Sequence, residues 1–83
     1  MLKALIGQTV TLPCVVQGEP SPEISWFHNG NPVRVEDGGP LRIQHAALAD
    51  QGTYRCVAKN NAGKDTLEVT LEVLSEYFLQ PLH

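Results

Sequence analysis

The chain has 83 residues and a formal net charge of −3, which suits one small domain. At this size a buried core alone gives marginal stability, so a covalent crosslink would contribute a large share. The six basic and nine acidic residues are scattered, so no basic stripe for nucleic acid is present. No apolar run approaches the ~20 residues that span a bilayer, and direct membrane insertion is not expected.

Residues 1–6 are too short for a signal peptide. We therefore expect the chain to be a module cut from a larger protein, with Met1 added as an initiator. Residues 9–17 alternate between apolar and polar and predict the first long strand. The proline-rich residues 18–22 then make a stiff turn. Residues 24–28 predict the next strand, which ends in a hairpin.

The hairpin is indicated by the Asn29-Gly30 dipeptide, a strong signal for a two-residue turn. We expect Asn31-Pro32 to end the hairpin. Residues 33–35 could add a short edge strand before the Gly- and Pro-rich residues 36–40 break the chain again.

Three further strands are predicted in the second half, over residues 41–44, 54–59 and 66–73. The last has the cleanest alternation in the chain. One helical turn at most is expected before residue 54, and residues 60–63 should form the turn between the last two strands. The side chains expected to face inward on these strands are Leu41, Ile43, Tyr54, Cys56, Ala58, Leu67, Val69, Leu71 and Val73.

Several motifs carry a resemblance to a known family. They are Gly7-Gln8-Thr9-Val10-Thr11-Leu12-Pro13-Cys14, Ile24-Ser25-Trp26-Phe27, Leu41-Arg42-Ile43 leading into Asp50-Gln51-Gly52-Thr53-Tyr54-Arg55-Cys56, and Asn60-Asn61-Ala62-Gly63. A Cys, a Trp, and a Tyr two positions before a second Cys follow the order of the immunoglobulin superfamily. The chain most closely resembles its intermediate (I-set) type. The resemblance implies an all-β, immunoglobulin-like β-sandwich of two antiparallel sheets with Greek-key topology.

The resemblance also assigns structural roles to the cysteines and the tryptophan. Cys14 and Cys56 would form a disulfide between the sheets, and Trp26 would pack against it. The two cysteines lie 42 positions apart, and closing a loop of that length contributes roughly 4 kcal/mol in the chain-entropy model. An intact bond would favour an oxidising, extracellular setting.

Tyr54 resembles the residue of the family's tyrosine corner, whose hydroxyl bonds to nearby backbone. Asp50 could stabilise the same corner by accepting bonds from backbone N–H groups, or by pairing with Arg34 or Arg42. The sequence leaves these alternatives open. Gly52 is best explained by backbone geometry.

Two departures from the family pattern are apparent. Only fourteen residues separate Trp26 from Leu41, so strand D should be short or missing. Few residues precede Gly7, so strand A should be truncated and only residues 4–7 would pair with the last strand. We therefore expect an I-set domain over residues 1–74.

The remaining residues, 75–83, form a C-terminal apolar tail or linker. The simpler interpretation is the start of the next segment of the parent protein, or added sequence. Alternatively, its apolar side chains dock on a partner or on an open sheet edge. These side chains are Tyr77, Phe78, Leu79 and Leu82.

No catalytic, cofactor or metal site is expected. The histidines (28, 45 and 83) have no metal-ligand spacing, and the cysteines form no CxxC pair. The serines (21, 25 and 75) lack the surrounding motif of a nucleophile. The charged and apolar residues expected to point outward on neighbouring strands, Phe27, Arg55, Val57 and Lys59, are instead candidates for partner binding.

The resemblance implies a non-enzymatic protein–protein interaction module of a multidomain cell-surface or extracellular-matrix protein, used in adhesion or receptor recognition. Its partner would be another protein, and a homodimer through an open edge or the tail is a further possibility. The alternative is a passive structural spacer, including a cytoplasmic repeat of a muscle filament with reduced cysteines. Fold alone does not choose between these functions.

Overall fold

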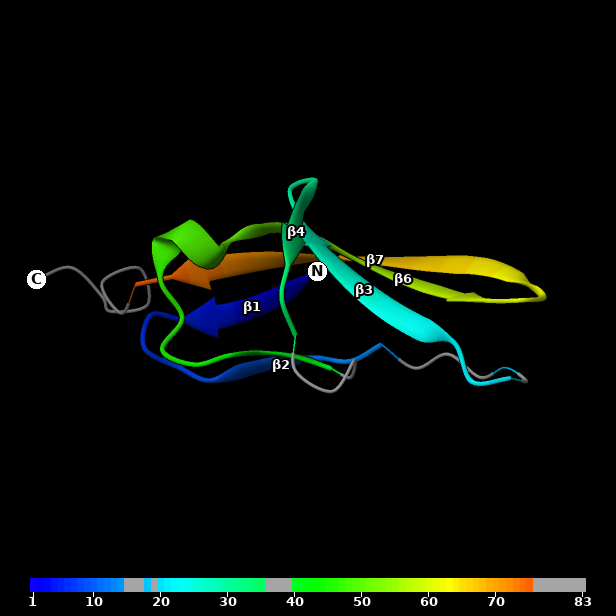
Figure 1. Ribbon diagram of the computed structural model, residues 1–83. Helices are drawn as coiled ribbons and strands as arrows, with labels where there is room; N and C mark the ends of the chain where they lie inside the picture. Colours follow the sequence, from blue (N-terminus) through cyan, green and yellow to red (C-terminus); the bar gives the residue numbers. More distant parts are fainter. Residues whose placement is uncertain (15–17, 19, 36–39, 76–83) are drawn as a thin grey trace, which may run out of the picture.

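The computed structural model describes residues 1–14, 18, 20–35 and 40–75. These residues form two sheets, as the immunoglobulin-like prediction requires (Figure 1). The larger sheet has five strands in the order β1-β7-β6-β3-β4, and the smaller pairs β2 with β5. The elements are β1 (Leu2–Leu5), β2 (Val10–Leu12), β3 (Glu23–His28), β4 (Asn31–Val33), β5 (Leu41–Ile43), the 3₁₀ turn η2 (Leu48–Asp50), β6 (Gly52–Asn60) and β7 (Gly63–Leu74).

The five-stranded sheet is built around the long β6–β7 hairpin, which pairs from Gly52↔Leu71 to Asn60↔Gly63. β3 lies antiparallel on the other side of β6. β1 lies parallel to β7, with Leu2 opposite Leu71. This N-terminal strand ends at Leu5, earlier than the predicted 4–7. Gly7 adopts a φ of +92°, and the chain turns there before the two-stranded sheet begins.

Two backbone hydrogen bonds hold the link between β1 and β2 to the segment that follows β5. The Gly7 N–H donates to the Ala46 carbonyl at 2.8 Å, and the Ala46 N–H donates to the Gln8 carbonyl at 2.9 Å. β2 is shorter than the predicted 9–17, of which 15–17 lie outside the described residues. Between β4 and β5, the described residues 34, 35 and 40 are not in a strand, which agrees with a short or missing strand D.

The β3–β4 hairpin has the predicted two-residue turn, with positive φ at Asn29 and Gly30. The prediction that Asn31-Pro32 ends the hairpin is wrong, because both residues belong to β4. Pro32 lies opposite Phe27, next to the pair that closes the turn. In this position an N–H would point away from β3, so proline costs the ladder no hydrogen bond on an edge strand.

The core lies between the sheets. The side chains that face it from β6 and β7 are those that the alternation predicts to point inward. Leu12, Leu71 and Cys56 are its largest fully buried side chains. Leu67 is the exception: it has the inward phase of β7 but is 46 % exposed. The β6–β7 hairpin extends at its turn end well away from η2 (Figure 1), and the three-residue strands of the smaller sheet do not bury it there.

Candidate functional site

The disulfide and the tryptophan occupy the centre of the sandwich. Cys14 follows β2 and is bonded to Cys56 on β6, with their Cα atoms 6.2 Å apart. Trp26 on β3 is the register partner of Cys56 and is buried. The bridge therefore connects the half-buried Cys14 to the buried Cys56 in the other sheet, which is a structural role and not that of a reactive thiol.

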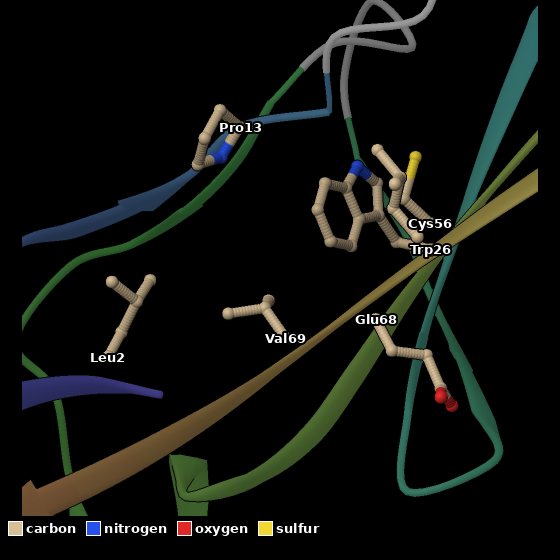
Figure 2. A pocket seen from close by; sticks show the side chains of 7 residues that line it. Leu2, Pro13, Trp26, Cys56, Glu68 and Val69 are labelled. Carbon is tan, nitrogen blue, oxygen red and sulfur yellow. The ribbon is translucent and has the colours of Figure 1, made fainter.

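Beside this centre lies an open pocket of about 300 Å³ that sequence reasoning did not anticipate. Figure 2 shows its lining, in which the Glu68 carboxylate points away from the Trp26 indole. The sequence gives no signal for it, because the pocket depends on how much of the inward-pointing Leu67 the smaller sheet leaves exposed. The lining residues are Leu2, Pro13, Trp26, Cys56, Leu67, Glu68 and Val69.

The corner between η2 and β6 is held by Tyr54 and Asp50. The buried Tyr54 hydroxyl donates to the Asp50 carbonyl, as in a tyrosine corner. The Asp50 carboxylate accepts from the Ala47 N–H at 2.8 Å, so the structure shows the backbone-bonded alternative for this residue. Burial, with a smaller effect from the Asp50 charge, raises the pKa of Tyr54 to about 12. The phenol therefore stays protonated, and remains a donor, to a more alkaline pH than an ordinary tyrosine.

The β3–β4 turn packs against this corner, a contact that the sequence did not reveal. The His28 ring stacks on Tyr54 with 4.2 Å between centroids, and its Nε2 lies 2.9 Å from the Gln51 carbonyl. The Asn29 carboxamide lies on Gly52, where a Cβ would come within 2.5 Å of Asn29 Oδ1. Gly52 also has a φ of +139°, so both space and backbone conformation require glycine there.

The four predicted binding residues that lie on β3 and β6 come together on the outer face of the larger sheet. We call Phe27, Arg55, Val57 and Lys59 the outer-face patch. Phe27 and Arg55 are register partners on β3 and β6, and the guanidinium carbon lies 5.3 Å from the Phe27 ring centroid. Phe27 and Val57 are half-buried, whereas Arg55 and Lys59 are exposed. Such a cation–π pair keeps an apolar ring and a charge together on one surface.

One end of the patch continues to the tip of the sandwich. The Asn60 side chain donates to the Pro20 carbonyl at 2.8 Å and accepts from the Ala62 N–H at 2.9 Å. Asn60 thus ties the loop before β3 to the β6–β7 turn. An open, polar pocket of about 330 Å³ lies at this tip. Its lining residues are Pro20, Ser21, Glu23, Lys59, Asn60 and Asn61.

The remaining predictions concern the tail, metal binding and membrane insertion. The tail residues Tyr77, Phe78, Leu79 and Leu82 lie outside the described residues. Within residues 1–14, 18, 20–35 and 40–75, no group of three or more metal-ligating side chains comes together. No helix in this same part of the chain is long and apolar enough to cross a membrane.

Comparison with known proteins places this geometry in a family. The family description "Immunoglobulin I-set domain" matches residues 1–73. The chain is 42 % identical to Hemicentin-1 of Homo sapiens over 79 residues, which cover 87 % of this chain and 1 % of Hemicentin-1. The chain therefore spans only a very small part of this curated relative.

Two solved structures show the same architecture. The structure of neural ectodermal development factor IMP-L2 has a TM-score of 0.81 and 32 % identity, covering 90 % of this chain and 40 % of that chain. Titin M4 has a TM-score of 0.77 and 30 % identity, covering 86 % of this chain and 83 % of that chain. The sandwich, its disulfide and its tyrosine corner, together with these matches, show that the chain belongs to the immunoglobulin I-set family.

Proposed function

We propose that this domain is a non-enzymatic protein-recognition module of a multidomain cell-surface or extracellular-matrix protein, and that it binds its partner through the outer-face patch. The observation that carries this proposal is the Phe27–Arg55 pair, in which a guanidinium covers a half-buried aromatic ring on an open sheet face. Arginine and aromatic side chains, phenylalanine among them, are enriched at protein–protein interfaces.

The neighbouring side chains support the same surface. Val57 adds a half-buried apolar group diagonal to Phe27, and Lys59 continues the positive charge toward the polar tip pocket. Edge pairing through β4 is a weaker route to a partner, because Pro32 supplies no outward N–H. Recognition is therefore expected through side chains on the sheet face and not through an added strand.

A pair of arginine substitutions on opposite sheets tests this proposal. Arg55→Glu reverses charge in the outer-face patch, and Arg42→Glu makes the same change on β5 in the smaller sheet, where Arg42 is also exposed. Immobilised wild-type domain is incubated with solubilised cell-surface and matrix proteins, and the retained proteins are compared. Arg55→Glu should lose a protein that the wild type and Arg42→Glu both retain. Equal retention by both variants would contradict the proposal.

A passive spacer is the second candidate, and the likeness to Titin M4 favours it. This alternative includes a repeat of an intracellular muscle filament, in which the cysteines stay reduced. Titration of free thiols in protein from its native compartment distinguishes the extracellular from the intracellular alternative. The extracellular proposal predicts no free thiol at Cys14 or Cys56, in keeping with the bond between them. Two titratable thiols would favour the intracellular spacer.

A further inference from the structure

The Asn29-Gly30 dipeptide of the β3–β4 turn can undergo a chemical reaction that has no part in the proposed function. Asparagine is among the thermolabile residues of proteins. When glycine follows it, the backbone rotates freely and no side chain hinders the glycine nitrogen from approaching the asparagine carboxamide. The turn is exposed at both residues, so water reaches it freely.

The fold holds the Asn29 carboxamide against β6 and away from the Gly30 nitrogen. Asn29 Oδ1 accepts from the Thr53 N–H at 2.9 Å, while the Asn29 N–H donates to the Thr53 carbonyl at 2.8 Å. His28↔Tyr54 is the last register pair of β3 and β6. The side-chain oxygen of Asn29 thus extends the ladder by one step into the turn, where the backbone has a φ of +51°.

Two neighbours enclose the carboxamide. A Cβ on Gly52 would lie 2.5 Å from Asn29 Oδ1 and 2.6 Å from Nδ2, so only glycine leaves room for it. Asn29 Nδ2 lies 3.4 Å from His28 Nε2. Rotating the carboxamide toward the Gly30 nitrogen therefore requires breaking the Thr53 hydrogen bond and leaving the surface of Gly52.

We propose that Asn29 is a deamidation site that the fold keeps closed, and that it reacts when the β3–β4 turn separates from residues 52–53. The Gly30 nitrogen attacks Asn29 Cγ and forms a new C–N bond. The Cγ–Nδ2 bond breaks, and Nδ2 leaves as ammonia with the proton lost from the Gly30 nitrogen. Water then opens the cyclic imide at either carbonyl and gives aspartate or isoaspartate.

The two products have different structural consequences. Aspartate keeps an oxygen that can accept from the Thr53 N–H, so the turn can close again. Isoaspartate places the side-chain methylene in the backbone of the turn, which disturbs the pairing of His28 with Tyr54 and Asn31. Formation of isoaspartate would thus leave a permanent record that the turn had opened.

Deamidation of the full chain is measured by peptide mass mapping, once in the folded state and once in denaturant with the disulfide reduced. The rate at Asn29 should be at least about tenfold lower in the folded protein, which corresponds to an opening free energy of about 1.4 kcal/mol or more. Equal rates in the two states would overturn the proposal.

A matched pair of glycine substitutions tests the mechanism. Gly52→Ala places a methyl group against the carboxamide, whereas Gly7→Ala also adds a side chain at positive φ but has nothing within 4 Å of the new Cβ. Deamidation at Asn29 should accelerate in Gly52→Ala and not in Gly7→Ala. Asn61, in the β6–β7 turn, serves as the internal reference and should not change. An unchanged Asn29 rate in folded Gly52→Ala would refute the mechanism.

If Gly52→Ala does not fold, the wild type provides the same test. In low concentrations of urea, hydrogen exchange of the Thr53 amide reports opening of the Asn29 bond. Exchange at Thr53 and deamidation at Asn29 should rise together. Deamidation that stays constant while Thr53 exchange accelerates would contradict the proposal.

Discussion

The two halves of the β6–β7 hairpin share one alternating pattern but differ in what covers them. In the half near η2, which we call the corner half, Leu71 and Val73 are only 1 % and 3 % exposed, because they share a buried cluster with Leu12 and Leu41 of the smaller sheet. In the half near the turn, which we call the turn half, Leu67 points to the same side of the sheet but is 46 % exposed. Alternation therefore determines which way a side chain points, and the opposite layer determines whether it is buried. Stability should reside in the corner half, leaving the turn half and the outer face available for contacts.

The largest expected effect comes from shortening one leucine in each half. Leu71→Ala removes a fully buried side chain and should lower the free energy of unfolding by about 2–5 kcal/mol. Leu67→Ala removes a half-exposed one and should cost less than about 1 kcal/mol. Urea denaturation of both variants measures the difference. Equal losses would mean that the turn half is as well packed as the corner half.

The tyrosine corner should give the next largest effect. Tyr54→Phe removes the donor to the Asp50 carbonyl and leaves that acceptor short of a partner, which should cost about 1–3 kcal/mol. Chemical denaturation at neutral pH measures this loss. A variant as stable as the wild type would show that the hydroxyl contributes little to the corner.

The stability of Tyr54→Phe should also depend on pH differently from that of the wild type. The pKa of Tyr54 is raised from 10.0 to about 12 on folding, so the unfolded chain loses this proton first. The wild type should therefore lose stability as the pH rises from 10 through 12, while this contribution is fully present below pH 10. Tyr54→Phe should lack this part of the alkaline loss. Parallel stability curves for the two proteins between pH 9 and 12 would contradict the shift.

The smallest effect concerns charge pairs on the outer face. Lys59 and Lys64 lie opposite each other near the hairpin turn, whereas Lys3 lies opposite Glu72 at the other end of the sheet. Lys64→Glu should stabilise the domain by roughly 0.2–1 kcal/mol, and Lys3→Glu should destabilise it by a similar amount. Both changes should shrink at high salt. Thermal melts at two ionic strengths check the signs, and two shifts in the same direction would argue against pairwise effects.

Much of the fold could be predicted from the sequence because its signals are local. The alternation around Tyr54 and Cys56 and the Asn29-Gly30 turn each depend on neighbouring residues, and the structure agrees with them. The exposure of Leu67 could not be predicted, because it depends on the length of strands in the other sheet. The contact between the Asn29 carboxamide and Gly52 could not be predicted either, because the two residues lie 23 positions apart in the sequence.

Native-state hydrogen exchange along the hairpin tests the central claim most directly. If stability resides in the corner half, the amides of Tyr54 and Leu71 should exchange only through global unfolding. The amides of Lys59 and Leu67, in the turn half, should exchange faster through local opening. Slow exchange of uniform free energy along the whole of β6 and β7 would contradict the division of the hairpin into a stabilising half and an uncovered half.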